Sequence, residues 1–346
     1  IQAFAFVLVG NWIMGIKGML LPYWIILFST AVFSIVVGLN ISDSLKSVVS
    51  IYVLIPLLLV PQILLGGAMV KFDKMNKRTT SQEYVPVIGD LMASRWSYEA
   101  LSVYQFMYNE YEKHFYEIEM KESQASFIVN YLIPELQQKL MANKDRITNS
   151  GSVKDYSTDI HILRNEVTAI ARYDDKVPLF EDIDNLTPDM FNSITASRLE
   201  IYLKKLHGYY LNAMDAAINE RDRKTKELSK RTGSKGKVIL LRQNYHNDKL
   251  AELVLNKRDF DKIIQFKDRL LQKAEPAFHI PESRFGRAHF FAPYKRLGGY
   301  IISTYWFNLI ILWIFNILFY LSLQFGVIKK GIDIFSNIGF KNTKSG

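Results

Sequence analysis

Four stretches of the chain carry no charged side chain, and they dominate its hydrophobic pattern. Residues 1–16, 18–42, 47–70 and 297–328 contain no Asp, Glu, Lys or Arg. A helix rises about 1.5 Å per residue, so roughly 20 apolar residues cross a hydrocarbon core about 30 Å thick. The last three stretches are long enough for that. We therefore expect membrane helices at 18–42, 47–70 and 297–328, because burial of three such runs in a soluble core would be unusual.

The first stretch, residues 1–16, is apolar but lacks the basic leader and the small-residue cleavage site of a signal peptide. We interpret it as the end of a truncated membrane helix, and we expect the chain to be part of a longer protein. The connection between 18–42 and 47–70 is too short to hold a domain.

Between the third and the last apolar stretch the pattern becomes that of a polar, largely helical region. Apolar or aromatic residues recur with a 3-4 spacing at Leu101, Tyr104, Tyr108, Tyr111, Phe115 and Ile118. A second phase follows at Val129, Leu132, Leu136 and Leu140. Such spacing is typical of the seam of a coiled coil or a helical hairpin.

Local signals divide this region further. Pro134 predicts a kink, because proline removes a helical hydrogen bond. Thr187 followed by Pro188 predicts a helix start, and the helix that they open should run past Lys230 to the glycines beyond it. A shorter helical segment is expected at 248–274.

Composition and charge exclude several classes of protein. The chain has 346 residues, 49% of them hydrophobic, and a formal charge of +9. The basic residues are not clustered as a nucleic-acid groove requires, so we expect no nucleic-acid partner. The chain has no cysteine, which rules out disulfides, thiolate catalysis and Cys-based zinc sites within it.

No catalytic constellation or metal site is evident. Residues 233–238 (GSKGKV) have the wrong spacing for a phosphate-binding loop and predict a flexible turn. No two histidines share the i, i+4 spacing of a helical metal site. Glu99, Glu110, Glu112 and Glu117 are expected on a solvated helix surface. We therefore expect neither a catalytic residue nor a cofactor in this chain.

The stretch 47–70 is unusual for an apolar helix because it contains Pro56, Pro61, Gly66 and Gly67. Prolines and glycines survive in a membrane helix where neighbouring protein compensates for the freed backbone groups. A glycine pair also allows another backbone to approach closely. This pattern favours a segment that packs against protein or borders a cavity, with a kinked but inert anchor as the alternative.

The sequence IPLLLVPQILLGGAMVKFDKMN, followed by SRWSYEAL, resembles the fifth membrane helix and re-entrant segment of ABCG-type permeases, the type-2 ABC exporter domain. The matching motif residues are Pro61, Gln62, Gly67, Arg95, Trp96, Tyr98, Glu99 and Ala100. The likeness covers about residues 1–110 and 295–330. Ala68 and Met69 stand where the family usually has two leucines that plug the path.

The resemblance implies an all-α membrane protein with ABC type-2 transmembrane helices and a largely helical extracytoplasmic insertion. In these terms 71–110 is an outer re-entrant segment, 111–296 the insertion and 329–346 a basic cytoplasmic tail. The fifth helix would line a path at the axis of a homodimer. The residues expected along it are Pro56, Val60, Ile63, Gly66, Gly67, Ala68 and Met69. ATP and Mg²⁺ would bind a nucleotide-binding domain in cis, outside this chain.

Three functions remain open at this point. The leading hypothesis is an exporter half that moves a hydrophobic or amphipathic substrate across the membrane. In the second, a mechanotransmission protein, the outer helical domain works on an extracytoplasmic protein partner. The third is a membrane-anchored scaffold without an ATPase.

The orientation implied by the resemblance conflicts with a simple count of basic residues, which favour the cytoplasmic side of membrane helices. More of them flank the spans on the side of the insertion than on the opposite side. The first set is Lys17, Lys71, Lys74, Lys77, Arg78, Arg284, Arg287, Lys295 and Arg296, and the second is Lys46, Lys329, Lys330, Lys341 and Lys344. Long domains are largely exempt from that rule, so we expect the insertion outside and the C-terminus in the cytoplasm.

Overall fold

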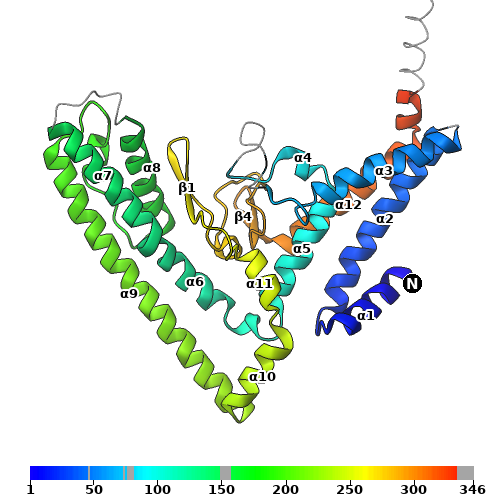
Figure 1. The fold of residues 1–346 in the computed structure, drawn as a ribbon, viewed down its shortest axis with the longest axis horizontal. Helices are drawn as coiled ribbons and strands as arrows, with labels where there is room; N and C mark the ends of the chain where they lie inside the picture. Colours follow the sequence, from blue (N-terminus) through cyan, green and yellow to red (C-terminus); the bar gives the residue numbers. More distant parts are fainter. Residues whose placement is uncertain (46, 73–74, 76–81, 149–156, 333–346) are drawn as a thin grey trace, which may run out of the picture. The chain divides into compact units, whose positions relative to one another are not determined.

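The computed structural model describes residues 1–45, 47–72, 75, 82–148 and 157–332. The chain forms two compact units (Figure 1). Unit 1 contains Ile1–Glu110 and Ile280–Gly346, and unit 2 contains Tyr111–His279. Each unit is described by itself.

Unit 1 holds the apolar helices of the chain. Its elements are α1 (Gln2–Met14), α2 (Leu20–Ser44), α3 (Val48–Leu64), α4 (Val87–Asp90), α5 (Ala93–Tyr108), β3 (Tyr294–Leu297), β4 (Tyr300–Ser303) and α12 (Thr304–Gln324). Helices α2, α5 and α12 pack against one another, with Ile26, Ala100 and Leu312 fully buried between them. Strands β3 and β4 form an antiparallel hairpin that leads directly into α12.

Within the described residues, two helices, α2 and α12, are long and apolar enough to cross a membrane by length and composition. The third predicted span is shorter than expected. α3 has 17 residues, or about 25 Å, and ends at Leu64, so residues 65–70 are not helical. The last predicted span, 297–328, includes a strand before α12 begins at Thr304. Of the predicted basic tail 329–346, residues 333–346 lie outside the described residues.

Both prolines of α3 lie inside the helix. None of the residues of α3 is buried within the unit, and apart from the half-buried Ile51, Leu54, Pro61 and Gln62 its side chains are exposed. The contact of this segment with α5 lies at the C-terminal end of α3 and just beyond it, where Gln62 and Gly66 meet Ser94.

Polar side chains join the apolar helices of unit 1. The Asn40 Nδ2 of α2 donates to the Phe319 carbonyl of α12 at 2.9 Å. In the reverse direction, the Asn316 Nδ2 of α12 donates to the Ser29 carbonyl of α2 at 3.1 Å. Thr30 of α2 is hydrogen-bonded through its hydroxyl to Ser97 of α5 at 2.7 Å. Hydrogen bonds of this kind hold helices together in lipid, where the hydrophobic effect does not drive their association.

Unit 2 is mostly helical. Its elements are α6 (Tyr116–Phe127), α7 (Ile133–Thr148), α8 (Ser157–Tyr173), α9 (Ser193–Thr232), α10 (Lys235–Tyr245), α11 (Asp248–Val254), β1 (Ile263–Phe266) and β2 (Arg269–Gln272). Helix α9 packs against α6, α7 and α10 (Figure 1). The core lies where α7, α8 and α9 meet, with Leu136, Leu163 and Leu203 fully buried.

The predicted seam from Leu101 to Ile118 does not form one helix. Helix α5 ends at Tyr108, and a 3-10 turn (Glu112–His114) precedes α6. Where a kink was predicted at Pro134, the structure has a π-helical turn, Ile128–Leu132, immediately before α7. A wider turn suits this position because proline has no N–H to donate and its ring crowds the preceding turn.

Helix α9 begins later than predicted and ends where predicted. Thr187 opens a turn, accepting hydrogen bonds from two backbone N–H groups that follow it. The helix starts at Ser193, where the side chain of Asn192 caps the N–H groups of Ile194 and Thr195. It ends at Thr232, and Gly233 follows with φ of 88°, a conformation that glycine adopts readily.

The helix predicted at 248–274 is wrong beyond Val254, because β1 and β2 form an antiparallel hairpin there. The turn is made by Lys267 with φ of 53°. A contact from α8 secures the hairpin: Glu166 accepts from the Arg269 Nε and from the Leu270 N–H, each at 2.9 Å. These partners are distant in sequence, so local periodicity did not reveal them.

Candidate functional site

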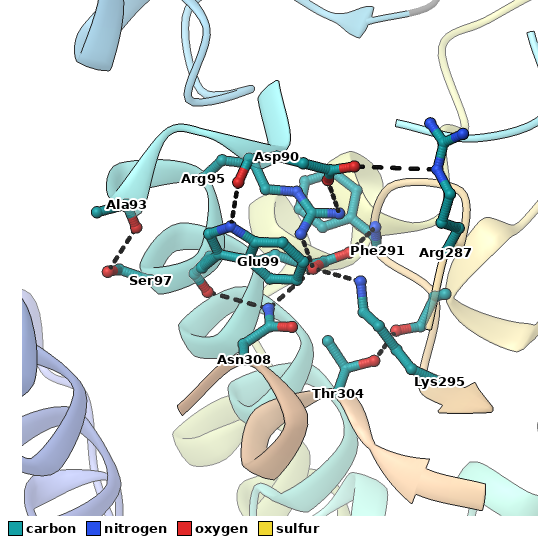
Figure 2. Close-up of polar contacts among 12 residues, drawn as sticks. Asp90, Ala93, Arg95, Ser97, Glu99, Arg287, Phe291, Lys295, Thr304 and Asn308 are labelled. Atoms are coloured by element: carbon teal, nitrogen blue, oxygen red, sulfur yellow. Dashed lines mark hydrogen bonds and ion pairs between the residues drawn. The ribbon is translucent and has the colours of Figure 1, made fainter. Parts of the chain in front are cut away.

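A cluster of buried charged side chains lies at the centre of unit 1. Figure 2 shows Asp90, Arg95 and Glu99 meeting Lys295 and Asn308 from the far end of the sequence. Arg95 is 1% exposed, whereas Glu99 and Lys295 are 0% exposed. Charged side chains are fully buried only when they are paired. The prediction that Glu99 lies on a solvated helix surface is therefore wrong.

Glu99 is the hub of this cluster. One carboxylate oxygen accepts from the Lys295 Nζ at 2.9 Å and from the Asn308 Nδ2 at 2.8 Å. The other oxygen accepts from the backbone N–H of Phe291 at 3.2 Å. Phe291 has φ of 66°, a conformation that is uncommon for a residue other than glycine. Glu99 thus joins α5 to α12, to β3 and to the segment before β3.

Arg95 balances this carboxylate from within α5. Its guanidinium lies 3.5 Å from Glu99 and 3.7 Å from Asp90, and it stacks 3.9 Å from the ring centroid of Trp96. The indole N–H of Trp96 donates to the Asp90 carbonyl at 2.8 Å. The ring therefore shields a cation that has two carboxylate neighbours.

The pKa values of Glu99 and Lys295 depend on the charges that surround them in the cluster. Burial first, and then the charge of Arg95, lower the pKa of Lys295, while the charge of Glu99 and its hydrogen bond raise it, and the net pKa is about 8. Burial raises the pKa of Glu99, but Arg95 and Lys295 together with hydrogen bonds outweigh it, so the pKa lies below its ordinary value. Both groups are therefore charged at neutral pH.

This arrangement fits a structural fastening better than a reaction centre. The carboxylate of Glu99 is enclosed and its oxygens are already occupied by donors, so it is not placed to exchange protons with a substrate from solvent. What it does is hold α5, β3 and α12 in one geometry.

The Pro61-Gln62 part of the motif lies at a second contact of α5. The side-chain oxygen of Gln62 accepts from the Ser94 N–H at 3.1 Å, and the backbone carbonyl of Gln62 accepts from the Ser94 hydroxyl at 2.5 Å. The first N–H groups of a helix have no partner within it, so Gln62 of α3 supplies a cap for α5. A Cβ on Gly66 would lie 2.9 Å from the Ser94 hydroxyl oxygen, and glycine is thus required for this close approach.

The expected path residues fall into two groups. Gly66 and Gly67 are buried within unit 1, and a Cβ on Gly67 would lie 2.5 Å from the Phe290 ring. The others, Pro56, Val60, Ile63, Ala68 and Met69, are exposed. The structure thus separates the glycines, which serve internal packing, from an uncovered apolar face.

The motif residues are brought together, but their partners were missed. Arg95 and Glu99 form the cluster with Trp96, and the Tyr98 ring packs on Phe290 and Phe291. Sequence analysis did not identify Lys295 or Asn308 as members. The signal available for Asn308 was a polar side chain inside an apolar span, which usually faces the interior of a helix bundle.

Unit 2 has its own cluster of charged side chains around a buried carboxylate. Glu112, expected on a solvated surface, is 1% exposed, and one of its oxygens lies 2.5 Å from the Nδ1 of His246. The other ring nitrogen of His246 lies 3.3 Å from Asp248. Nearby, Arg221 donates to Glu122 at 2.6 Å. The cluster joins α6 and the 3-10 turn before it to α9 and to the residues that follow α10.

We expect Glu119 to make the stability of unit 2 dependent on pH. Its pKa is raised to about 7, by burial first and then by the charge of Glu112, with Arg221 acting against the shift. An ordinary glutamate titrates near 4.5, so between these values the folded state holds a proton that the unfolded chain releases. We expect the free energy of unfolding to fall as the pH rises through this window, by about 1–3 kcal/mol, and to level off above it.

Thermal unfolding of unit 2 within the whole protein at pH 5 and pH 8 checks this expectation. Glu119→Gln should remove most of the difference and should be the more stable protein at pH 8. The exposed neighbour Glu117 provides a matched control, and Glu117→Gln should keep the pH dependence of the wild type. An unchanged pH dependence in Glu119→Gln would contradict the assignment.

Among the residues that the structure describes, no group of three His, Asp or Glu side chains could hold a metal ion. No protein-family model, curated protein or solved structure matches this chain.

Proposed function

We propose that this chain is the permease part of an ATP-driven exporter of the ABCG type, acting as a homodimer in a membrane. It would move a hydrophobic or amphipathic substrate along the exposed face of α3. ATP and Mg²⁺ would bind a nucleotide-binding domain outside this chain. In this proposal α2, α3 and α12 cross the bilayer, and unit 2 is the extracytoplasmic insertion.

The observation that carries the proposal is the contact between the two parts of the motif. Gln62 and Ser94 are 32 positions apart and are joined by two hydrogen bonds. The adjacent Arg95 and Glu99 then fasten α5 to α12. A movement of α5 would therefore reach both α3 and α12. A permease needs such a connection when a nucleotide-binding domain outside the membrane supplies the movement.

The uncovered face of α3 supports a second copy as its neighbour. Val60 is 51% exposed and Ile63 is 56% exposed, and no residue of the helix is buried. Exposed apolar surfaces of this extent mark sites of contact with lipid or protein. Pro56, Val60 and Ile63 share one side of the helix by their spacing.

The cluster also weakens the count of basic residues that opposes the proposed orientation. Lys295 was counted on the side of the insertion, but its charge is paired with Glu99 and fully buried. A buried, paired lysine does not interact with lipid headgroups, so it gives no information on sidedness.

The alternative is a mechanotransmission protein whose insertion acts on an extracytoplasmic partner. It is favoured by α9, which has 40 residues and thus a length of about 60 Å. One experiment separates the two functions, because only the exporter needs a passage along α3.

Single cysteines on α3 test the proposal in the full-length protein, in a background without other cysteines. Val60→Cys should form a disulfide-linked dimer on mild oxidation, because the proposal places residue 60 of the two copies side by side. A disulfide requires Cα atoms within about 7 Å of each other. Attachment of a bulky thiol reagent to the same cysteine should reduce ATP-driven transport of an amphipathic dye at least fivefold.

Leu58 provides the matched control, since it is 41% exposed and lies on the opposite side of α3. Leu58→Cys should neither crosslink nor lose transport after labelling. Equal behaviour of the two variants would contradict the exporter proposal. Retained function after labelling of Val60→Cys would favour the mechanotransmission alternative.

A further inference from the structure

The β3–β4 hairpin is a preformed apolar projection beside the start of α12. Its turn is Gly298-Gly299, with Gly298 at φ of 61°. The segment around Phe285 adds a third strand-like edge: the Gly298 N–H donates to the Arg284 carbonyl at 2.8 Å, and Phe285 bridges to Leu297. These backbone hydrogen bonds fix the hairpin before any partner is present.

Three large side chains gather on one face of this tip. Leu297 pairs with both Phe285 and Tyr300, and side chains of directly paired residues lie on the same face of a sheet. Phe285 is 87% exposed, Leu297 53% and Tyr300 80%. Ile301, on the opposite face, is also exposed. The apolar surface of the tip thus lies mainly on the first face, because Ile301 shares the second face with Arg296.

The position of α12 indicates what covers this tip. Helix α12 begins at Thr304, the residue after β4 ends. Its first residue is pinned, because the Thr304 hydroxyl donates to the Ala292 carbonyl at 2.5 Å. Trp306, in the first turn of α12, is exposed. Aromatic side chains concentrate at the membrane–water interface, so the hairpin continues an aromatic zone at the end of an apolar helix.

We propose that the tip formed by Phe285, Leu297, Tyr300 and Ile301 inserts into the headgroup region of the bilayer surface at which α12 begins. The occupant is lipid, with Arg284 exposed beside Phe285 and placed to meet lipid phosphates. Tyr300 suits this depth because its ring is apolar and its hydroxyl remains hydrated. The inference rests on the membrane placement of α12 in the proposed function.

Fluorophores on single cysteines test the inference, since the chain has no cysteine of its own. The full-length protein, in a background without other cysteines, is placed in nanodiscs and labelled at Phe285→Cys or Tyr300→Cys with an environment-sensitive dye. Nitroxide-bearing lipids then quench the dye from a shallow or a deep position, and iodide quenches it from water. Ile310→Cys, on the exposed side of α12, reports the membrane placement of that helix. Phe260→Cys, 97% exposed and flanked by two aspartates, reports any partitioning of the dye itself.

We expect the shallow nitroxide to quench positions 285 and 300 at least twofold more than position 260, and the deep nitroxide to act most strongly on position 310.

Quenching at 310 without quenching at 285 and 300 would overturn the hairpin inference alone. An unquenched position 310 would overturn the membrane placement and the inference with it. Protection of 285 and 300 from both lipid and iodide would show that protein covers the tip, and quenching at 260 equal to that at 300 would show that the dye causes the signal. Either result would also overturn the inference.

Discussion

Glu99→Gln is expected to destabilise unit 1 by about 3–5 kcal/mol, the cost of removing one partner from a buried ion pair. The substitution leaves the charges of Lys295 and Arg95 close together without their shared carboxylate. It also reduces the acceptor capacity available to Asn308 and to the Phe291 N–H. The measurement is the midpoint of denaturant-induced unfolding in mixed micelles, followed by circular dichroism.

The double variant Glu99→Gln with Lys295→Met distinguishes loss of pairing from loss of shape. The double variant removes the charges of both Glu99 and Lys295 but keeps a side-chain oxygen at position 99. It should therefore recover at least half of the stability that Glu99→Gln loses. The exposed pair of Glu227 with Arg231, at 2.8 Å, provides the control. Glu227→Gln should change stability by less than about 1 kcal/mol. A single variant as stable as the wild type would show that the cluster does not hold unit 1 together.

Gly67→Ala is expected to cost about 2–4 kcal/mol, from backbone strain and overpacking combined. Gly67 has φ of 82°, and an added Cβ would lie 2.5 Å from one Phe290 ring carbon and 2.9 Å from the Phe72 ring. These two rings pack edge to face with centroids 5.0 Å apart, so neither can move without disturbing the other. The same denaturation measurement checks the effect.

The steric and backbone parts of this cost are separable. Phe290→Leu in combination with Gly67→Ala should relieve the contact but not the strained φ, so that it restores part of the stability and not all of it. Gly38→Ala is the control, because a Cβ there meets nothing within 4 Å in the middle of a helix. It should be neutral or slightly stabilising. A neutral Gly67→Ala would mean that the glycine is not held as the structure places it.

Features with local causes could be predicted from the sequence. The mostly helical architecture is confirmed, and α2 was predicted within two residues of Leu20–Ser44. The end of α9 was predicted because a glycine in the left-handed region follows it. The start of α9 was not, since Asn192 was a competing cap that the Thr-Pro signal concealed.

Features with distant causes could not be predicted. Glu99 was assigned to solvent because charged positions on a helix usually face water, and its burial depends on Lys295, 196 positions later in the sequence. The hairpin of β1 and β2 lies in a segment that was predicted to be helical, and the contact from Glu166 that secures it lies outside that segment. The resemblance directed attention to the motif, but it did not reveal which residues complete the cluster.

The π-helical turn Ile128–Leu132 sets the rotational register of α7. A π turn accommodates one residue more than an α turn, which rotates the following helix by about 100°. Leu136 and Leu140 reach the core of unit 2 with this offset in place. Loss of one residue between Phe127 and Ile133 would rotate both leucines away from the core. The length of this short segment is therefore constrained, even at positions where the side chain itself is not.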